Sequence, residues 1–206
     1  MSSRTYHEAI WEAVPPGRQP VDFDLRRAFL LAHVNPGERV LDVGCGEGSF
    51  AIELTRAGAE VVALDVAQEP LDRARLREPA LDLRLVEGEG PWALRDCGFD
   101  VVWAGEVIEH VADTGAWLSE VRRVLRPGGR LLLTTPAVGR GALLRAALDR
   151  SSFAERFDPL SDHLRFYSRA TLSGLLAGFG FESIEVRCAR GRGGRLLLAR
   201  AQRARF

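Results

Sequence analysis

Apolar positions along this chain change between two spacings, and the change predicts strands and helices in turn. Val40, Leu41 and Val43 form a short apolar run that suits a buried parallel strand, and residues 50–57 follow with helical spacing. Strand-like and helix-like segments continue to alternate up to Thr135. This is the pattern of βαβ units, so the chain is predicted to form a parallel sheet covered by helices.

Further helices and a final strand pair are predicted outside that alternation. The spacing of apolar residues and the Gly or Pro stops predict helices over 23–34, 113–125 and 168–179. Two apolar segments near the C-terminus, 181–187 and 194–200, predict an antiparallel pair at the edge of the sheet.

The alternation of strand-like and helix-like segments stops after Thr135. Residues 140–150 have a helix-like pattern, and 151–162 have the character of a loop. An insertion at this point lies over the carboxyl ends of the strands, where ligands bind in open α/β sheets. We therefore interpret 136–167 as a substrate lid, the alternative being a surface decoration without a role in specificity. Residues 1–35 are expected to be an N-terminal helical extension, and 1–206 to form one domain.

The most informative stretch is a glycine loop directly after the first strand. Gly44, Gly46 and Gly48 alternate there, and glycine lets the backbone turn sharply and approach a ligand closely. A dinucleotide fingerprint needs glycine at its sixth position, but counting from Gly44 that position is Ser49. The pattern is therefore Gly-x-Gly-x-Gly, with Asp42 inside the preceding strand. The N–H groups at the start of the next helix are expected to face the same crevice.

This pattern resembles the first motif of the class I S-adenosylmethionine-dependent methyltransferases, and the resemblance extends along most of the chain. Further segments are similar to the family's second to fifth strands and their loops, in order: 61–65, 85–90, 99–104 and 125–133. The resemblance implies an α/β fold with a Rossmann-like seven-stranded sheet, mostly parallel with an antiparallel final strand and with helices on both faces. It also implies S-adenosylmethionine as the cofactor.

The resemblance extends to the ribose and adenine contacts. Asp65, at the end of the second strand, would accept hydrogen bonds from both ribose hydroxyls. Glu89 stands where the family usually has an Asp beside the adenine amino group, and Glu87 is a rival for that role.

The methionyl end is assigned in the same way. Asp42 would fix the glycine loop or reach the methionyl amine through water. The carbonyl groups of Gly44 and of Gly105 or Ala104 would accept hydrogen bonds from that amine. The full set of expected cofactor-binding residues is Asp42, Gly44, Cys45, Gly46, Gly48, Asp65, Glu89, Gly90 and Gly105.

A second group of polar residues follows the fourth strand. If this segment is helical, Glu106, Glu109 and His110 stand at i, i+3 and i+4 and share a face beside the transferred methyl group. His163, which follows Asp162, supplies a second imidazole before a later helix. Carboxylates and imidazoles can bind a divalent metal such as Mg²⁺, Mn²⁺ or Fe²⁺. Without a metal, His110 or His163 would take the proton directly.

This group is similar to that of two branches of the superfamily. The polyprenyl-hydroquinone and catechol O-methyltransferases of ubiquinone synthesis have a Glu-x-x-Glu-His motif, and the small-RNA 3′-terminal 2′-O-methyltransferases add a later His at a metal. The catalytic residues and candidate metal ligands implied here are Glu106, Glu109, His110 and His163. We expect O-methylation of a small-molecule hydroxyl. The alternatives are RNA 3′-terminal 2′-O-methylation and a non-catalytic S-adenosylmethionine-binding module.

The amino-acid composition of the chain indicates which kind of partner and which compartment to expect. The 28 basic residues are all Arg and balance 28 acidic ones, so the net charge of zero argues against a nucleic-acid partner. Three widely spaced cysteines suit a reducing compartment, no apolar run could span a membrane, and 1–12 lack signal-peptide features. We therefore expect a cytoplasmic enzyme whose partner is a small-molecule methyl acceptor. His7 and His33 lie outside every motif and are expected to be structural or exposed.

Overall fold

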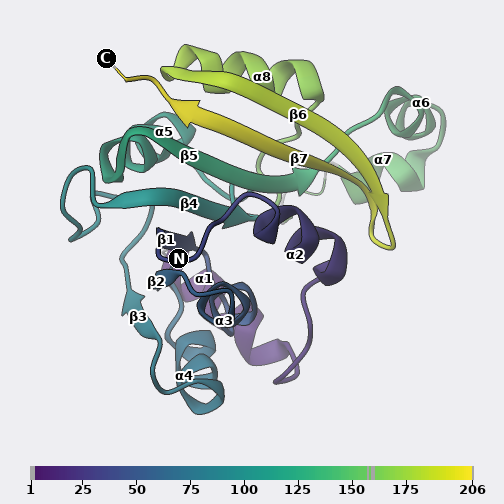
Figure 1. The fold of residues 1–206 in the computed structure, drawn as a ribbon. Coiled ribbons are helices and arrows are strands. Elements are labelled where there is room, and N and C mark those ends of the chain that lie inside the picture. Colours follow the sequence, from purple (N-terminus) through teal and green to yellow (C-terminus); the bar gives the residue numbers. More distant parts are fainter. Residues whose placement is uncertain (1–2, 157, 159–160, 206) are drawn as a thin grey trace.

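One seven-stranded sheet runs through the computed structural model, which describes residues 3–156, 158 and 161–205 (Figure 1). The strands are β1 (Arg39–Val43), β2 (Glu60–Asp65), β3 (Asp82–Leu85), β4 (Phe99–Gly105), β5 (Leu125–Pro136), β6 (Phe181–Gly191) and β7 (Gly194–Arg203). The helices are α1 (Ser3–Ala13), α2 (Phe23–Leu31), α3 (Ser49–Arg56), α4 (Gln68–Arg77), α5 (Thr114–Val124), α6 (Arg140–Leu148), α7 (Arg150–Arg156) and α8 (Arg169–Gly178).

The strand order is β3-β2-β1-β4-β5-β7-β6. Strands β1 to β5 pair in parallel, and β7 runs antiparallel to both of its neighbours. This confirms the predicted mostly parallel, Rossmann-like sheet with an antiparallel strand near its end. The order reverses between β1 and β4, and such a switch point leaves a crevice at the carboxyl ends of the strands.

Both faces of the sheet are buried, which explains why the central strands are apolar at successive positions. Leu41 belongs to the core on one face, together with Trp117 of α5 and Leu172 of α8. Its neighbour Val40 belongs to the core on the other face, with Leu30 of α2 and the helix α3. No helix of the described residues has the length and apolar character needed to cross a bilayer.

The predicted helices and the final strand pair are confirmed with shifted ends. Helix α5 begins after Asp113, whose carboxylate accepts a hydrogen bond from the Ala116 N–H at 2.9 Å. Helix α8 begins with a capping box between Ser168 and Thr171. Helix α2 ends at Leu31, earlier than predicted, and the β6–β7 hairpin is longer than predicted.

The prediction of a loop over 151–162 is wrong in its first part, because α7 occupies it. The backbone carbonyl of Asp149 accepts from the Phe153 N–H at 2.9 Å, as in the first turn of a helix. The Ser151 hydroxyl donates to the Asp149 carboxylate at 2.7 Å. Polar residues that suggest a loop therefore begin a helix here.

The two segments predicted to flank the sheet contain helices. Helices α1 and α2 fall within 1–35, and α6 and α7 fall within 136–167, beyond the carboxyl end of β5 (Figure 1). Residues 157 and 159–160 of the predicted lid lie outside the described residues. The lid function of 136–167 stays a prediction.

Candidate active site

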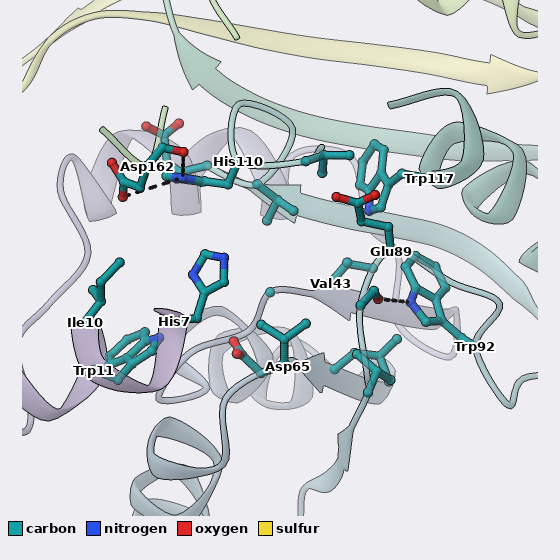
Figure 2. A pocket seen from close by; sticks show the side chains of 18 of the residues that line it. His7, Ile10, Trp11, Val43, Asp65, Glu89, Trp92, His110, Trp117 and Asp162 are labelled. Carbon is teal, nitrogen blue, oxygen red and sulfur yellow. Dashed lines mark hydrogen bonds and ion pairs between the residues drawn. The ribbon is translucent and has the colours of Figure 1, made fainter. Parts of the chain in front are cut away.

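A cavity of about 270 Å³ opens at the carboxyl ends of the central strands. The loops after β1, β2, β3 and β4 line it from the sheet, and α1 lies across it on the opposite side (Figure 2). This is the crevice where an open α/β sheet binds its ligand. Five of the residues singled out from the sequence line it: Gly44, Asp65, Glu89, Glu106 and His110.

The loop after β1 requires glycine because its backbone has positive φ angles and because neighbouring side chains leave no room for a Cβ atom. Gly44, Gly46 and Gly48 have φ angles of 69°, 53° and 72°, which side-chain-bearing residues rarely adopt. A Cβ atom on Gly44 would lie 2.6 Å from the Val107 side chain, and one on Gly46 would lie 2.7 Å from Trp11. Gly44 lines the cavity, whereas Gly46 is covered by the Trp11 indole.

The carboxylate of Asp65 is held at the end of β2 by two backbone groups. Its oxygens accept from the Gly46 N–H at 2.8 Å and from the Ala67 N–H at 2.9 Å. Asp65 lines the cavity although it is only 6% exposed, and burial raises its pKa. Asp42 and Cys45 are buried and do not line the cavity. Burial, together with the charge of Asp65, raises the pKa of Asp42 to about 7.

The loop after β3 brings Glu89 to the cavity and leaves its rival outside. The Glu89 carboxylate accepts from the Ala112 N–H and, at 2.9 Å, from the Asp113 N–H, so it joins this loop to the start of α5. Glu87 is exposed and does not line the cavity. Gly90 also lies outside the lining, where a Cβ atom would meet the Glu120 side chain.

Two tryptophans that the sequence reading did not select line the same end of the cavity as Glu89. The indole N–H of Trp92 donates to the Gly88 carbonyl at 3.1 Å, and Trp117 projects from α5 (Figure 2). Val86 adds an aliphatic surface. Together their side chains give this end of the cavity an apolar lining, which suits a flat aromatic group.

The segment after β4 is a turn, so the helical arrangement considered for it is wrong. Glu106 has φ of 60°, in the left-handed region, and the His110 N–H donates to the Val107 carbonyl at 2.9 Å. Glu109 is 1% exposed, and its carboxylate accepts from the Thr135 hydroxyl at 2.9 Å. Burial and the neighbouring Glu106 raise the pKa of Glu109 to about 8. Burial also raises the pKa of Glu106.

The imidazole of His110 is oriented by the loop that precedes α8. Its Nδ1 lies 2.9 Å from the Asp162 carbonyl, which can only accept, so Nδ1 carries the proton and Nε2 the lone pair. The Asp162 carboxylate is 3.6 Å from Nδ1. This loop is tied to the turn by the Leu164 N–H, which donates to the Glu109 carbonyl at 2.8 Å. Burial lowers the pKa of His110, so the neutral ring is favoured at neutral pH.

Three of the four candidate metal ligands come together in space. Ligand atoms of Glu109, His110 and His163 all lie within 4.8 Å of one another, and the two imidazole rings are 4.9 Å apart between centroids. Glu106 lies outside this group. Within the described residues, one oxygen of Glu106 and one of Glu109 are buried without a hydrogen-bond partner.

Arg26 of α2 is a further residue that the sequence reading missed. Its guanidinium is 4% exposed and lies over the Phe50 ring at 4.7 Å. It also lies so close to Gly105 that a Cβ atom there would clash with it. The charge of Arg26 favours the ionised forms of Glu106 and Asp42. An Arg in an amphipathic helix is usually at the surface, so no local pattern could have revealed this position.

His7, which was expected to be structural or exposed, lines the cavity. His7 and Trp11 project from α1 into the cavity, and the His7 ring lies 6.2 Å from the His110 ring between centroids (Figure 2). His33 lies outside the lining, with Nδ1 2.8 Å from the Phe29 carbonyl.

Comparisons with known proteins agree on one family. A family model described as a methyltransferase domain matches residues 18–186. A probable S-adenosylmethionine-dependent methyltransferase of Mycolicibacterium smegmatis is 35% identical over 180 residues, which is 84% of this chain and 67% of that protein. A ubiquinone biosynthesis O-methyltransferase of Xanthomonas axonopodis is 32% identical over 168 residues, which is 79% of this chain and 70% of that protein.

A solved structure shares the fold at low sequence identity. Phosphoethanolamine N-methyltransferase 2 of Haemonchus contortus, in complex with phosphomonomethylethanolamine and S-adenosylhomocysteine, gives a TM-score of 0.74 at 18% identity. The likeness covers 98% of this chain and 58% of that chain.

Proposed function

Since the chain belongs to the methyltransferase domain family and is an S-adenosylmethionine-dependent methyltransferase, we propose that it methylates a hydroxyl oxygen of a small molecule. The observation that carries the proposal is the neutral imidazole of His110, with its bare Nε2 beside Glu109 and His163. A hydroxyl must lose its proton to become a good nucleophile, and a fixed, unprotonated imidazole is suited to take it.

In this proposal the cofactor lies along the cavity. Its ribose hydroxyls donate to Asp65, whose carboxylate oxygens each have a lone pair left beside their backbone bonds. Its adenine lies in the compartment of Trp92 and Trp117, and its amino group reaches Glu89. The methionyl end faces Gly44 and the turn after β4. The other predicted cofactor residues lie outside the lining: Asp42, Cys45, Gly46, Gly48, Gly90 and Gly105. Asp42, Cys45, Gly46 and Gly48 belong to β1 and the loop that follows it, Gly90 to the loop after β3, and Gly105 to the end of β4.

His110 is the proposed base. Its Nδ1–H is held by the Asp162 carbonyl, and the proton of the acceptor hydroxyl passes to Nε2. The resulting imidazolium is stabilised by the Asp162 carboxylate at 3.6 Å. Alignment of the oxygen with the sulfonium methyl group supplies the rest of the rate, because the cofactor carries its own leaving group.

A divalent cation such as Mg²⁺ or Mn²⁺ fits the same residues. The buried, unpartnered oxygen of Glu109 and the two imidazoles offer ligands of the appropriate type within 4.8 Å of one another. Glu109, His110 and His163 would hold the ion, with Glu106 beside them. It would polarise the acceptor hydroxyl and lower its pKa.

The proposal is tested by measuring S-adenosylhomocysteine formation with a panel of acceptors. The panel contains simple phenols and catechols, primary amines, thiols and a short RNA duplex with free 3′ ends. The proposal expects turnover with a hydroxyl compound and its loss in His110→Ala. Turnover confined to amines or thiols contradicts oxygen as the acceptor atom, and turnover confined to the duplex contradicts a small molecule. Cofactor binding without turnover of any acceptor would leave a binding module.

A further inference from the structure

The imidazole of His7 lies in the middle of the cavity without a hydrogen bond. It comes from α1 and stands between Asp65 at the end of β2 and His110 in the turn after β4 (Figure 2). Its ring contacts are with Tyr6 and His110, at 5.7 and 6.2 Å between centroids. Within the described part of the chain neither His7 nitrogen has a hydrogen-bond partner. An imidazole has a donor and an acceptor to satisfy, so this one is available to a ligand.

The rotation of α1 that aims His7 inward is fixed by polar contacts on both sides of it. The next residue, Glu8, accepts from the backbone N–H groups of Gln68 and Glu69 at 2.7 and 3.1 Å, in the first turn of α4. Further along, Arg73 donates to the carbonyl groups of Trp11 and Val14 at 3.0 and 2.7 Å. These hydrogen bonds hold α1 against α4 at the edge of the cofactor cavity, with His7 facing into the cavity.

We infer that His7 is an acceptor-binding residue: its N–H donates to the same acceptor oxygen that His110 deprotonates. The inference rests on the proposed function and adds a residue to it. The centroids of the two rings are 6.2 Å apart, and ring nitrogens that face one another lie closer together than the centroids do. One oxygen atom between the rings can therefore be within hydrogen-bond distance, about 2.9 Å, of a nitrogen of each imidazole. His110 Nε2 accepts the proton from one side, and the His7 N–H donates from the other.

In this arrangement the two imidazoles have different roles. His7 stabilises the charge that develops on the oxygen as its proton leaves, and it fixes the oxygen in front of the methyl group. Since His7 belongs to α1 and not to the sheet, the acceptor site is complete only while α1 lies across the cavity.

The direct test is the binding of nitrocatechol, a coloured catechol, to the complex of the enzyme with S-adenosylhomocysteine. Loss of one neutral hydrogen bond should raise the dissociation constant about 5–10-fold in His7→Ala. The affinity for S-adenosylhomocysteine should change less than the affinity for nitrocatechol, because the proposed function assigns the cofactor contacts to Asp65, Glu89 and the two tryptophans. His33→Ala is the matched control, because it removes a histidine outside the cavity and should bind nitrocatechol like the wild type.

Chemical rescue separates a ligand contact from a structural role. Added imidazole should restore nitrocatechol binding to His7→Ala. Added 1-methylimidazole, which has no N–H when neutral, should not do so in mildly alkaline buffer. Equal binding in wild type and His7→Ala, no binding to wild type, or equal rescue by both compounds would each overturn the inference.

A second variant tests the orientation of α1. Glu8→Gln weakens the hydrogen bonds that hold α1 against α4, so it should itself reduce nitrocatechol binding. The double variant Glu8→Gln, His7→Ala should bind nitrocatechol only slightly more weakly than His7→Ala alone. If the two substitutions weaken binding by fully additive free energies, Glu8 does not act through the position of His7. Binding that depends on His7 without turnover of any hydroxyl compound would contradict the proposed function and the role of His110 as base, and would leave only the contact between His7 and the bound catechol.

Discussion

Replacing Glu109 by Gln should make the protein more stable in alkali. Glu109 is 1% exposed, and burial together with the charge of Glu106 raises its pKa from an ordinary value of 4.5 to about 8. The folded state therefore binds a proton that the unfolded state releases between these two values. Folding stability falls as the pH rises through this window, because the unfolded chain ionises more readily. Gln cannot ionise, so the variant lacks this loss.

The magnitude follows from the width of the window. Each pH unit between the two pKa values costs up to about 1.4 kcal/mol of unfolding free energy. Relaxation around the charge reduces the total to about 2–4 kcal/mol. The Gln carbonyl oxygen can still accept from the Thr135 hydroxyl, so the substitution does not leave that hydroxyl without a partner. For a chain of 206 residues this corresponds to about 5–10 °C in Tm.

The assay is thermal unfolding of wild type and Glu109→Gln at about pH 5 and about pH 9. The two Tm values should be close at the lower pH, and the variant should melt at the higher temperature at the upper pH. Glu87→Gln, which neutralises an exposed carboxylate of the loop after β3, is the matched control and should follow the wild type. An equal loss of stability in wild type and Glu109→Gln between the two pH values would contradict the raised pKa of Glu109.

Three further predictions address the cofactor and the chemistry. Asp65→Ala should weaken S-adenosylhomocysteine binding by about 2 kcal/mol in calorimetry, with NAD not binding to either protein, and unchanged affinity would contradict the ribose assignment. Gly46→Val should lower cofactor affinity in a folded protein, because the new side chain meets Trp11 at a backbone φ of 53°; wild-type affinity would refute this. If a metal acts, a chelator should remove activity and Mn²⁺ should restore it. If a histidine acts as the base, activity should resist the chelator and the rate should fall in acid. Wild-type activity in a double His110→Ala, His163→Ala variant would exclude both the metal and the histidine base.

The sheet and one side of the cavity could be predicted from the sequence because they depend on local pattern. Alternating apolar segments predict the order of strands and helices, and the three glycines after β1 predict a ligand-binding loop at this place, where Gly44 lines the cavity. Asp65 and Glu106 reach the cavity because Asp65 is the last residue of β2 and Glu106 directly follows β4, and the carboxyl ends of parallel strands meet at one edge of the sheet.

The other side of the cavity could not be predicted, because long-range contacts determine it. His7 faces inward since Glu8 binds backbone groups of α4, 60 and 61 residues away along the chain. The burial of Arg26 depends on the Phe50 ring and on the approach of α2 to Gly105. The spacing of Glu106 and His110 suggested a helix, but the positive φ of Glu106 prevents one.

In the proposed function, this methyltransferase transfers its methyl group to a hydroxyl oxygen beside His110. The most direct measurement uses S-adenosylmethionine with a trideuterated methyl group and a catechol acceptor, followed by mass spectrometry and NMR of the product. We expect a trideuteromethoxy group on the acceptor, formed by the wild type and not by His110→Ala. Label found on nitrogen or carbon, or undiminished methoxy formation by His110→Ala, would contradict it.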